Sequence, residues 1–374
     1  MRYKTFQDLQ LSALGMGCMR LPLKGGNSEI DEEQTARMAA YAMTHGVNYF
    51  DTAWGYHGGN SESVMGKILS AYPRDAYHLA SKFPGYDLAN MPKVQEIFAR
   101  QLERCQSEYF DFYLFHNVCE LNIDAYLNEE YGILDHLLKQ KEAGRIRHLG
   151  FSAHGSIPVM ERFLNAYGEH MEFCQIQLNY LDWSLQDAKG KVELLNARHI
   201  PIWVMEPLRG GKLCTLDEKA MSELQKLRPQ ESMSGWAFRF LQSIPGVTMI
   251  LSGMSDMQQL QENIETFADE QPLNEDEMKT LTGIGRRMST SVPCTACRYC
   301  IEHCPRSLDI PELIRLYNDM VYSGGSFSAR NAVNALPADK QPSACIGCGH
   351  CQALCPQQIH IPGIMRDLTR RISE

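Results

Sequence analysis

Residues 32–52, EEQTARMAAYAMTHGVNYFDT, combine a helical pattern and a strand pattern in one short stretch. The segment EEQTARMAAYAMTHG has apolar residues at helical spacing and closes on Gly46, a residue typical of helix ends. The run VNYFDT follows at once and has the β-branched and aromatic composition of a buried strand. This stretch therefore predicts a fold in which helices and strands alternate.

The same alternation repeats from about residue 14 to residue 268. Helical stretches such as PKVQEIFARQLERCQ and YGILDHLLKQKEAG separate seven further strand-like runs. These runs are LGMGCM, HLASKF, DFYLFH, IRHLGFS, FCQIQLNY, IPIWVME and VTMILSG. Eight strand–helix units in roughly 255 residues predict an α/β fold, a closed (β/α)8 TIM barrel. An open doubly wound sheet is the alternative, but no GxGxxG motif follows the first strand.

Ionisable side chains stand at the ends of three consecutive predicted strands. Asp51 ends the second strand, Lys82 the third and His116 the fourth. Barrel enzymes build their sites at these carboxyl ends, so we expect the three groups on one rim. Tyr56 follows in the loop after Asp51. A single such residue would be ordinary, since rim positions are partly solvated, but three in register with a tyrosine indicate a catalytic site.

These four side chains have the chemistry that carbonyl reduction requires. A hydride must reach the carbon while a proton donor meets the oxygen. A free tyrosine, with a pKa of about 10, needs a neighbouring cation before it can exchange its proton readily at neutral pH. Lys82 can supply that cation, and Asp51 would hold Lys82 as an ion pair. His116 would donate a hydrogen bond that positions the carbonyl oxygen.

The sequence resembles the aldo-keto reductase family across essentially residues 1–270. The matching motifs are DTAWGY at 51–56, SESVMG at 61–66, ASKF at 80–83, FHN at 115–117, GFS at 150–152, QIQLNY at 175–180, PLRGGKL at 207–213 and QLQEN at 259–263. The resemblance implies a catalytic tetrad of Asp51, Tyr56, Lys82 and His116. It also implies NADH or NADPH lying extended over the barrel mouth without a Rossmann fold.

The resemblance assigns further residues to the nicotinamide end of the cofactor. Ser152 and Gln175 would bind the carboxamide. The asparagine that often follows the serine is Ala153 here, so His154 would have to take its place. Met205 stands where a tyrosine commonly stacks on the ring, and we expect weaker stacking from this softer side chain.

The remaining cofactor assignments concern the phosphates and the adenosine. The glycines of loop 207–213 would let the backbone approach the pyrophosphate, with Lys212 as counter-charge, although an ordinary turn is the alternative. Gly253 and the helix start after it would cradle a phosphate. Gln259 stands where arginine is common, so the sequence does not predict NADP over NAD. The residues assigned to the cofactor are Ser152, Gln175, Met205, Pro207, Leu208, Gly211, Lys212, Gly253, Gln259, Glu262 and Asn263, the last two beside adenine.

Two features beside the tetrad concern the substrate. Trp54 either walls the substrate pocket or packs on the barrel. Residues 118–133, VCELNIDAYLNEEYGI, are expected to form a pocket wall. Neither feature identifies the substrate beyond a small carbonyl compound or alcohol.

Eight of the thirteen cysteines lie in two runs, CTACRYCIEHCP from Cys294 and CIGCGHCQALCP from Cys345. Both runs have CxxCxxCxxxCP spacing, and the repeat extends into RSLDIP and QQIHIP. Three evenly spaced thiolates suit three corners of a [4Fe-4S] cluster, while the fourth, before proline, usually serves the other cluster. Structural zinc, the alternative, prefers two separated CxxC pairs. The predicted ligand sets are Cys294, Cys297, Cys300 and Cys355 for one cluster and Cys345, Cys348, Cys351 and Cys304 for the other.

This tail resembles two-cluster ferredoxin domains. Residues 311–325, PELIRLYNDMVYSGG, have an amphipathic pattern ended by glycines, which favours the mostly helical ferredoxin type. A helix over 274–287, with an Asn274–Glu277 capping box, is expected to close the barrel. We therefore predict a barrel domain over 1–287 and a ferredoxin-type domain over 288–374. The linker between them is short, so we expect the two to be packed together.

Composition excludes several classes of function. A net charge of −9 without a basic stripe argues against nucleic acid as a partner. No apolar run has the length of a membrane span and the N-terminus lacks a signal-peptide pattern, so we expect a cytoplasmic protein without a membrane partner. The chain is long for a disulfide scaffold, which favours metal ligation by the paired runs. Five scattered cysteines are expected to be buried: Cys18, Cys105, Cys119, Cys174 and Cys214.

Three functions are compatible with these motifs. The first, preferred because the tetrad is complete, is an NAD(P)H-dependent carbonyl reductase or alcohol dehydrogenase whose clusters transfer electrons, sense oxidants or stabilise the fold. The second is a ferredoxin-coupled reductase of an anaerobe, because a flavin normally links two-electron hydride chemistry to one-electron clusters and Met205 leaves room for another ring. The third is a non-catalytic electron-transfer module whose barrel binds partners. The expected partners are a small substrate and a ferredoxin or other redox protein.

Overall fold

Eight parallel strands close into a barrel, as the alternation predicts. The computed structural model describes residues 1–25, 29–289, 291–294, 297–355 and 357–374. The strands follow the order β10-β3-β4-β5-β6-β7-β8-β9 around the barrel. Their bounds are Leu14–Gly17 (β3), Tyr49–Asp51 (β4), His78–Phe83 (β5), Phe110–Val118 (β6), Ile146–Ala153 (β7), Cys174–Gln177 (β8), Ile202–Met205 (β9) and Val247–Ser252 (β10). The predicted (β/α)8 barrel is confirmed.

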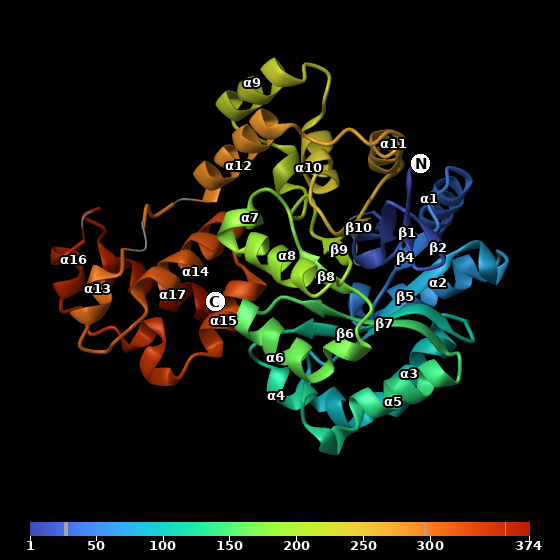
Figure 1. Cartoon of the computed structure of the whole chain (residues 1–374), viewed down its shortest axis with the longest axis horizontal. Coiled ribbons are helices and arrows are strands. Elements are labelled where there is room, and N and C mark those ends of the chain that lie inside the picture. Colours follow the sequence, from blue (N-terminus) through green and yellow to red (C-terminus); the bar gives the residue numbers. More distant parts are fainter. Residues whose placement is uncertain (26–28, 290, 295–296, 356) are drawn as a thin grey trace.

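Helices surround the strands on the outside of the barrel (Figure 1). Their starts follow local sequence: Asp31 caps the first helix by accepting a hydrogen bond from the Gln34 amide at 2.9 Å. The helices are α1 (Glu32–Thr44), α2 (Ser61–Leu69), α3 (Val94–Arg104), α4 (Ile123–Tyr126), α5 (Ile133–Glu142), α6 (Ile157–Tyr167), α7 (Asp182–Leu185), α8 (Ala188–Ala197), α9 (Glu218–Leu227), α10 (Met233–Gln242) and α11 (Met257–Thr266). No helix in the described part of the chain has the length and apolarity needed to cross a membrane.

An N-terminal hairpin closes the bottom of the barrel. Strands β1 (Tyr3–Phe6) and β2 (Leu9–Ser12) pair antiparallel. The ring of Phe6 lies 5.0 Å from that of Trp203 and 5.7 Å from that of Phe112, centroid to centroid. These aromatic residues form the interior core of the barrel, so its lower end is filled.

A capped helix leads from the barrel to the C-terminal region. In α12 (Glu275–Ser289), the Glu277 amide donates to Asn274 Oδ1 at 3.0 Å. The Asn274 amide donates in return to Glu277 Oε2 at 2.9 Å. This reciprocal pair is the predicted capping box.

The chain after α12 is helical and has an apolar core of its own. Its helices are α13 (Tyr299–Glu302), α14 (Ile310–Ser323), α15 (Phe327–Asn334), α16 (His350–Ala353) and α17 (Ile361–Ser373). Leu313, Leu316, Met320 and Leu368 are among its buried residues. Figure 1 shows α14 and α15 between the barrel helices α7 and α8 and the cysteine-bearing α13 and α16. The predicted helical character and close packing of this region agree with the structure.

Candidate functional site

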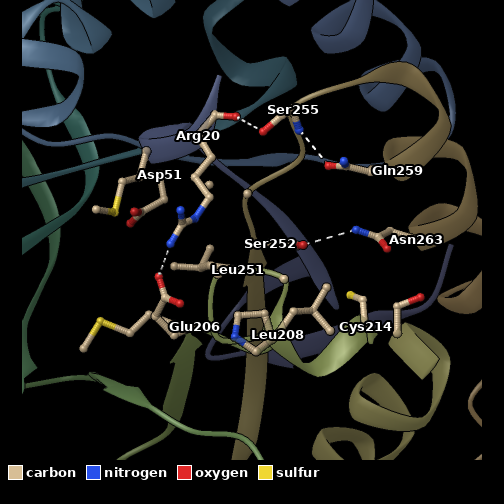
Figure 2. A pocket seen from close by; sticks show the side chains of 18 of the residues that line it. Arg20, Asp51, Glu206, Leu208, Cys214, Leu251, Ser252, Ser255, Gln259 and Asn263 are labelled. Carbon is tan, nitrogen blue, oxygen red and sulfur yellow. Dashed lines mark hydrogen bonds and ion pairs between the residues drawn. The ribbon is translucent and has the colours of Figure 1, made fainter. Parts of the chain in front are cut away.

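A cavity of about 650 Å³ opens at the carboxyl ends of the barrel strands (Figure 2). The alternating direction of side chains along each barrel strand explains which of them reach this cavity. Side chains two residues apart on a strand point the same way. Asp51 follows the interior residue Tyr49, and Lys82 follows the interior residue Ala80. Each reactive group therefore lies one step above the filled barrel core.

Most of the predicted site residues line this cavity. Those present are Asp51, Tyr56, Gln175, Met205, Pro207, Leu208, Gly211, Gly253, Gln259, Glu262 and Asn263. Four predicted residues are not among the lining residues: Lys82, His116, Ser152 and Lys212. The first three are packed directly behind the cavity wall, whereas Lys212 points elsewhere.

Lys82 joins two members of the predicted tetrad. Its Nζ donates to Asp51 Oδ1 at 2.6 Å and to the carbonyl oxygen of Thr52 at 2.8 Å. The same Nζ lies 5.1 Å from the centre of the Tyr56 ring. Burial disfavours the charge, but Asp51 and Tyr56 raise the pKa of Lys82 above its usual value. Lys82 is therefore a buried cation in contact with both groups.

Tyr56 lies half-buried beside this cation and keeps its proton at neutral pH. Burial raises the pKa of Tyr56 to about 12, although Lys82 acts in the opposite direction. The ring of His116 lies edge-on to that of Tyr56, 6.1 Å between centroids. Burial and then the Lys82 charge hold the pKa of His116 well below its usual value. At neutral pH Tyr56 is thus a protonated phenol, and His116 is a neutral imidazole that can donate one hydrogen bond.

The nicotinamide end of the predicted site contains an unpaired amide. Gln175 Oε1 is buried and has no hydrogen-bond partner among the described residues. Ser152 pairs in register with Gln175, and its Oγ accepts a hydrogen bond from the Asn117 amide at 2.8 Å. Ala153 faces the opposite side of the strand, in the core between strands and helices. A carboxamide ligand would satisfy the free Gln175 oxygen.

His154, expected near the carboxamide, and Trp54, expected at the substrate pocket or packed on the barrel, are not among the residues that line the cavity. His154 stacks edge-on against Phe327 of α15 at 6.3 Å, and its Nδ1 lies 3.4 Å from Ser328 Oγ. Trp54 instead packs under the Arg104 guanidinium, whose carbon is 3.8 Å from the ring centre. The packing interpretation of Trp54 therefore matches the structure.

The backbone of loop 207–213 has glycines that would let a ligand approach it closely. Gly210 and Gly211 have φ values of 66° and 86°, the left-handed region that favours glycine. Lys212 turns outward, however. Its Nζ donates to the carbonyl oxygen of Tyr322 at 3.2 Å and to that of Ser323, at the end of α14. This contact competes with its predicted role at a pyrophosphate.

Polar side chains organise the opposite end of the cavity. Gln259 donates to Asp256 Oδ2 at 2.8 Å and accepts from the Ser255 amide at 2.9 Å (Figure 2). Asn263 donates to Ser252 Oγ at 3.1 Å. These contacts stabilise the turn that leads into α11. The groups that make them are neutral or acidic, which agrees with the absence of lysine and arginine from the sequence of this segment.

Sequence reasoning missed an ion pair across the cavity. Arg20, just after β3, reaches Glu206, just after β9, with 3.0 Å between Nη2 and Oε1 (Figure 2). The sequence feature that could have predicted this contact is Arg20 itself, a basic residue immediately after the first barrel strand, on the same rim as the predicted tetrad. Arg20 is a cation on the cavity wall, whereas residues 253–263 contain no lysine or arginine.

The prediction that Cys214 is buried is wrong. Cys214 is exposed and lines the cavity, whereas Cys18, Cys105, Cys119 and Cys174 are buried as expected. The physical reason is its place at the end of a short 3-10 turn, Lys212–Cys214, which lies over the barrel mouth and not between strand and helix.

The eight C-terminal cysteines line two small cavities, four each. One is lined by Cys294, Cys297, Cys300 and Cys355, and the other by Cys304, Cys345, Cys348 and Cys351. None of the eight forms a disulfide. Apolar side chains such as Ile314, Leu308 and Met365 line the rest of the cavities. Four thiols around an apolar space are a donor set that fits an iron–sulfur cluster.

A buried ionic network joins the cavity loop to the cysteine-bearing region. Arg209 Nε lies 3.2 Å from Asp182 Oδ2, and Arg209 also binds Asp319 of α14. Gln186 donates to Asp319 Oδ2 at 2.9 Å. With the Lys212 contact, this network attaches loop 207–213 to α14.

Both parts of the chain match known protein families. Residues 13–286 match the aldo/keto reductase family and residues 293–360 match a 4Fe-4S dicluster domain. The uncharacterised oxidoreductase YqkF of Bacillus subtilis is 25% identical over 309 residues, which cover 73% of this chain and 92% of that protein.

Solved structures show the same fold. The holo form of aldo-keto reductase AKR11C1 from Bacillus halodurans superposes with a TM-score of 0.61 at 22% identity, covering 76% of this chain and 96% of that one. An aldo-keto reductase from Klebsiella pneumoniae in complex with NADPH gives 0.60 at 19% identity, covering 75% and 94%. The chain is an oxidoreductase that belongs to the aldo/keto reductase family, with a 4Fe-4S dicluster domain at its C-terminal end.

Proposed function

We propose that the protein reduces a small carbonyl compound, or oxidises the corresponding alcohol, with NADH or NADPH through Asp51, Tyr56, Lys82 and His116. The observation that carries this proposal is the position of Lys82, which contacts the Asp51 carboxylate and the Tyr56 ring beside the open cavity. The substrate carbonyl would occupy the space above these groups.

Each side chain has a distinct part in the reaction. The bound nicotinamide supplies or accepts the hydride. Tyr56 donates its phenolic proton to the carbonyl oxygen, and Lys82 stabilises the phenolate that remains. Asp51 holds Lys82 in place and keeps it charged. His116, neutral at physiological pH, donates a hydrogen bond that orients the same oxygen.

Several observations support a nicotinamide cofactor. The unpaired Gln175 oxygen matches a carboxamide donor, and Gly210 and Gly211 leave backbone accessible to phosphates. Arg20 is a cation on the cavity that can meet the pyrophosphate once it releases Glu206. The NADPH-bound relative has the same fold. The residues around Gln259 provide no cation for a 2'-phosphate, so the choice between NADH and NADPH is part of the test.

We further propose that residues 288–374 form a cytoplasmic ferredoxin-type domain that binds two [4Fe-4S] clusters. Each cluster would use one of the two sets of four cysteines that line the cavities. Such clusters exchange single electrons. A reducing compartment keeps these thiols available for iron.

Changing Tyr56 to Phe tests the hydride mechanism. We expect turnover of a carbonyl panel, assayed anaerobically with NADH and NADPH, to fall by about 100- to 10,000-fold, because the proton donor is lost. Tyr72→Phe, on a half-buried tyrosine outside the cavity, is the matched control. Undiminished nicotinamide-dependent turnover by the Tyr56 variant would contradict the proposal.

Single cysteine changes test the cluster assignment. Iron and sulfide analysis of the anaerobically purified protein should give about eight of each per chain. Cys355→Ser should perturb the cluster of Cys294, and Cys304→Ser that of Cys345, each giving a distinct electron paramagnetic resonance change after reduction. Cys214→Ser is the control. Zinc in place of iron, or identical spectra for the two variants, would refute the assignment.

A second candidate function is a one-electron reductase supplied by ferredoxin. The observation that favours it is the attachment of loop 207–213 to α14 through Arg209 and Lys212, which brings the cluster region to the cavity. Met205 on the cavity wall leaves room for a flavin. Turnover with reduced ferredoxin or viologen but not with nicotinamide, and flavin in the denatured supernatant, would establish this function instead.

A further inference from the structure

A second cavity, of about 360 Å³, lies between the barrel and the cysteine-bearing region. On one side are the starts of α6 and α8, and on the other are α14 and α15. None of its lining residues is shared with the nicotinamide cavity. It is therefore a separate site, and nothing in the proposed reaction uses it.

Lys191 of α8 is a buried cation without a partner in this cavity. Only 5% of its surface is exposed. Among the residues that the structure describes, no carboxylate lies within ion-pair distance of its ammonium and no acceptor receives its hydrogen bonds. Burial lowers the pKa of Lys191, and the carboxylate of Glu120 opposes this only in part. A buried ammonium of this kind is costly unless an anion accompanies it.

The other charged groups of the cavity already have partners. Glu312 accepts two hydrogen bonds from Arg315, at 2.7 and 2.8 Å, and the same guanidinium donates to a backbone carbonyl of the barrel. Asp319 binds Arg209. Two further carboxylates accept from backbone amides: Glu120 from Ser156 at 2.8 Å and Asp187 from Gly190 at 3.2 Å. Among the described lining residues, Lys191 is the cation that has no ion-pair partner.

Neutral polar groups line the same cavity as the Lys191 ammonium. Helix α6 begins at the cavity with Ile157; the Ser156 side chain does not cap it, and its first turn contains no acidic residue. His154 and the Ser328 hydroxyl add polar atoms. Burial and the Lys191 charge lower the pKa of His154 to about 4, so its imidazole adds no second charge. The Ser156 amide at the start of α6 already donates to Glu120, so an added anion would be held by the Lys191 ammonium and these neutral groups.

We propose that this interdomain cavity binds a small anion with a carboxylate or phosphate group, held by the Lys191 ammonium between the barrel and α14. The volume admits a metabolite of modest size, and the site stands independently of the proposed reductase mechanism. Because its walls come from both parts of the chain, the bound anion strengthens their contact.

Calorimetric titration of the full protein with inorganic phosphate and with acetate tests this site. Lys191→Met should weaken binding of the effective anion by at least about tenfold, because one charge-assisted contact is lost. Without anion, the same variant should unfold at an equal or higher temperature, since a buried unpaired charge is removed. Lys189→Met, two residues away and exposed in an ion pair with Glu193, is the matched control.

The outcomes separate the alternatives. Binding of phosphate alone assigns a phosphoryl ligand, and binding of acetate alone a carboxylate. Binding that persists in Lys191→Met belongs to the nicotinamide cavity and overturns the proposal, as does equal loss in Lys189→Met. Absence of binding by both probes also overturns it. Lys191→Gln, which keeps a polar tip, replaces the methionine variant if circular dichroism shows that Lys191→Met does not fold.

Discussion

Lys82 shows how the fold keeps one buried side chain charged. Burial of an ammonium is unfavourable, yet Asp51 at 2.6 Å keeps this one charged beside Tyr56. The pKa of Tyr56 nevertheless stays near 12, because burial outweighs the nearby cation. In the proposed reaction the tyrosine would therefore be a stable proton donor, and its phenolate would form only during turnover or at high pH.

This arrangement predicts different pH profiles in the two directions. Reductive turnover should be flat between about pH 6 and 9, since Tyr56 stays protonated and His116 stays neutral. Alcohol oxidation should rise with pH, since it needs the deprotonated tyrosine. Profiles of kcat/KM measured in both directions check this. A bell-shaped reductive profile centred on a histidine pKa would contradict it.

Replacing Lys82 by Met should raise the pKa of Tyr56 further and reduce oxidation more than reduction, with an overall loss of about 100- to 10,000-fold. The removed cation is what stabilises the phenolate. Steady-state rates in both directions measure the effect. Lys139→Met, on the exposed side of α5, should retain full activity; an active Lys82 variant would show that another group stabilises the phenolate.

Among the elements, the N-terminal hairpin has a purely structural part. Phe6→Ala should lower stability by about 3–5 kcal/mol, because it leaves a cavity against Trp203 in the closed end of the barrel. The melting temperature should fall by several degrees while KM stays unchanged. Leu9→Ala, on a partly buried neighbour, should have a smaller effect. A change in KM would show that the barrel floor and the site are coupled.

Helix α14 has a different part, since it binds the loop that forms one cavity wall. Burial opposes ionisation, but the Arg209 guanidinium holds the pKa of Asp319 below its usual range. Asp319→Asn should cost roughly 3 kcal/mol, because Arg209 loses a buried partner. Loop 207–213 should then exchange hydrogen faster, and KM for the nicotinamide should rise more than kcat falls.

Asp339→Asn is the matched control for that experiment. Asp339 is exposed and only 3.6 Å from Lys340, a surface pair of little energetic value. Hydrogen exchange in α14 and in loop 207–213 should be unchanged in this variant. Equal exchange in both variants would show that α14 does not position the loop.

At the scale of the whole molecule, the apolar core of the C-terminal region is separate from the two apolar clusters of the barrel. The core of the C-terminal region includes Cys300 and Cys351, so metal binding and folding should be linked there. We expect the C-terminal region to unfold in a transition of its own, at a lower temperature than the barrel. Oxidative removal of the clusters with a chelator should abolish this transition. The barrel transition should persist.

Tryptophan fluorescence can follow the barrel alone in that experiment, because Trp54, Trp183, Trp203 and Trp236 all precede α12. Loss of the tryptophan transition together with the clusters would mean that the barrel cannot fold without its C-terminal partner. A retained barrel with weaker nicotinamide binding would agree with the contacts of Arg209 and Lys212.

Much of this organisation could be predicted because it depends on local patterns. Helical spacing closed by Gly46, the ionisable residues that end successive strands and the CxxCxxCxxxCP runs are all properties of short segments. Each determines a backbone state or a ligand geometry without reference to distant residues. The barrel, the composition of the rim and the grouping of cysteines follow from such patterns by general rules.

The tertiary structure alone decided which distant side chains meet. Phe6 filling the barrel floor, Arg20 crossing to Glu206, and Lys212 turning to the end of α14 join residues about 100 to 200 positions apart. The exposure of Cys214 and the isolation of Lys191 likewise depend on how loops and helices pack. Sequence spacing carries no information on these contacts, because the packing of whole elements determines whether a charge is paired or a thiol is buried.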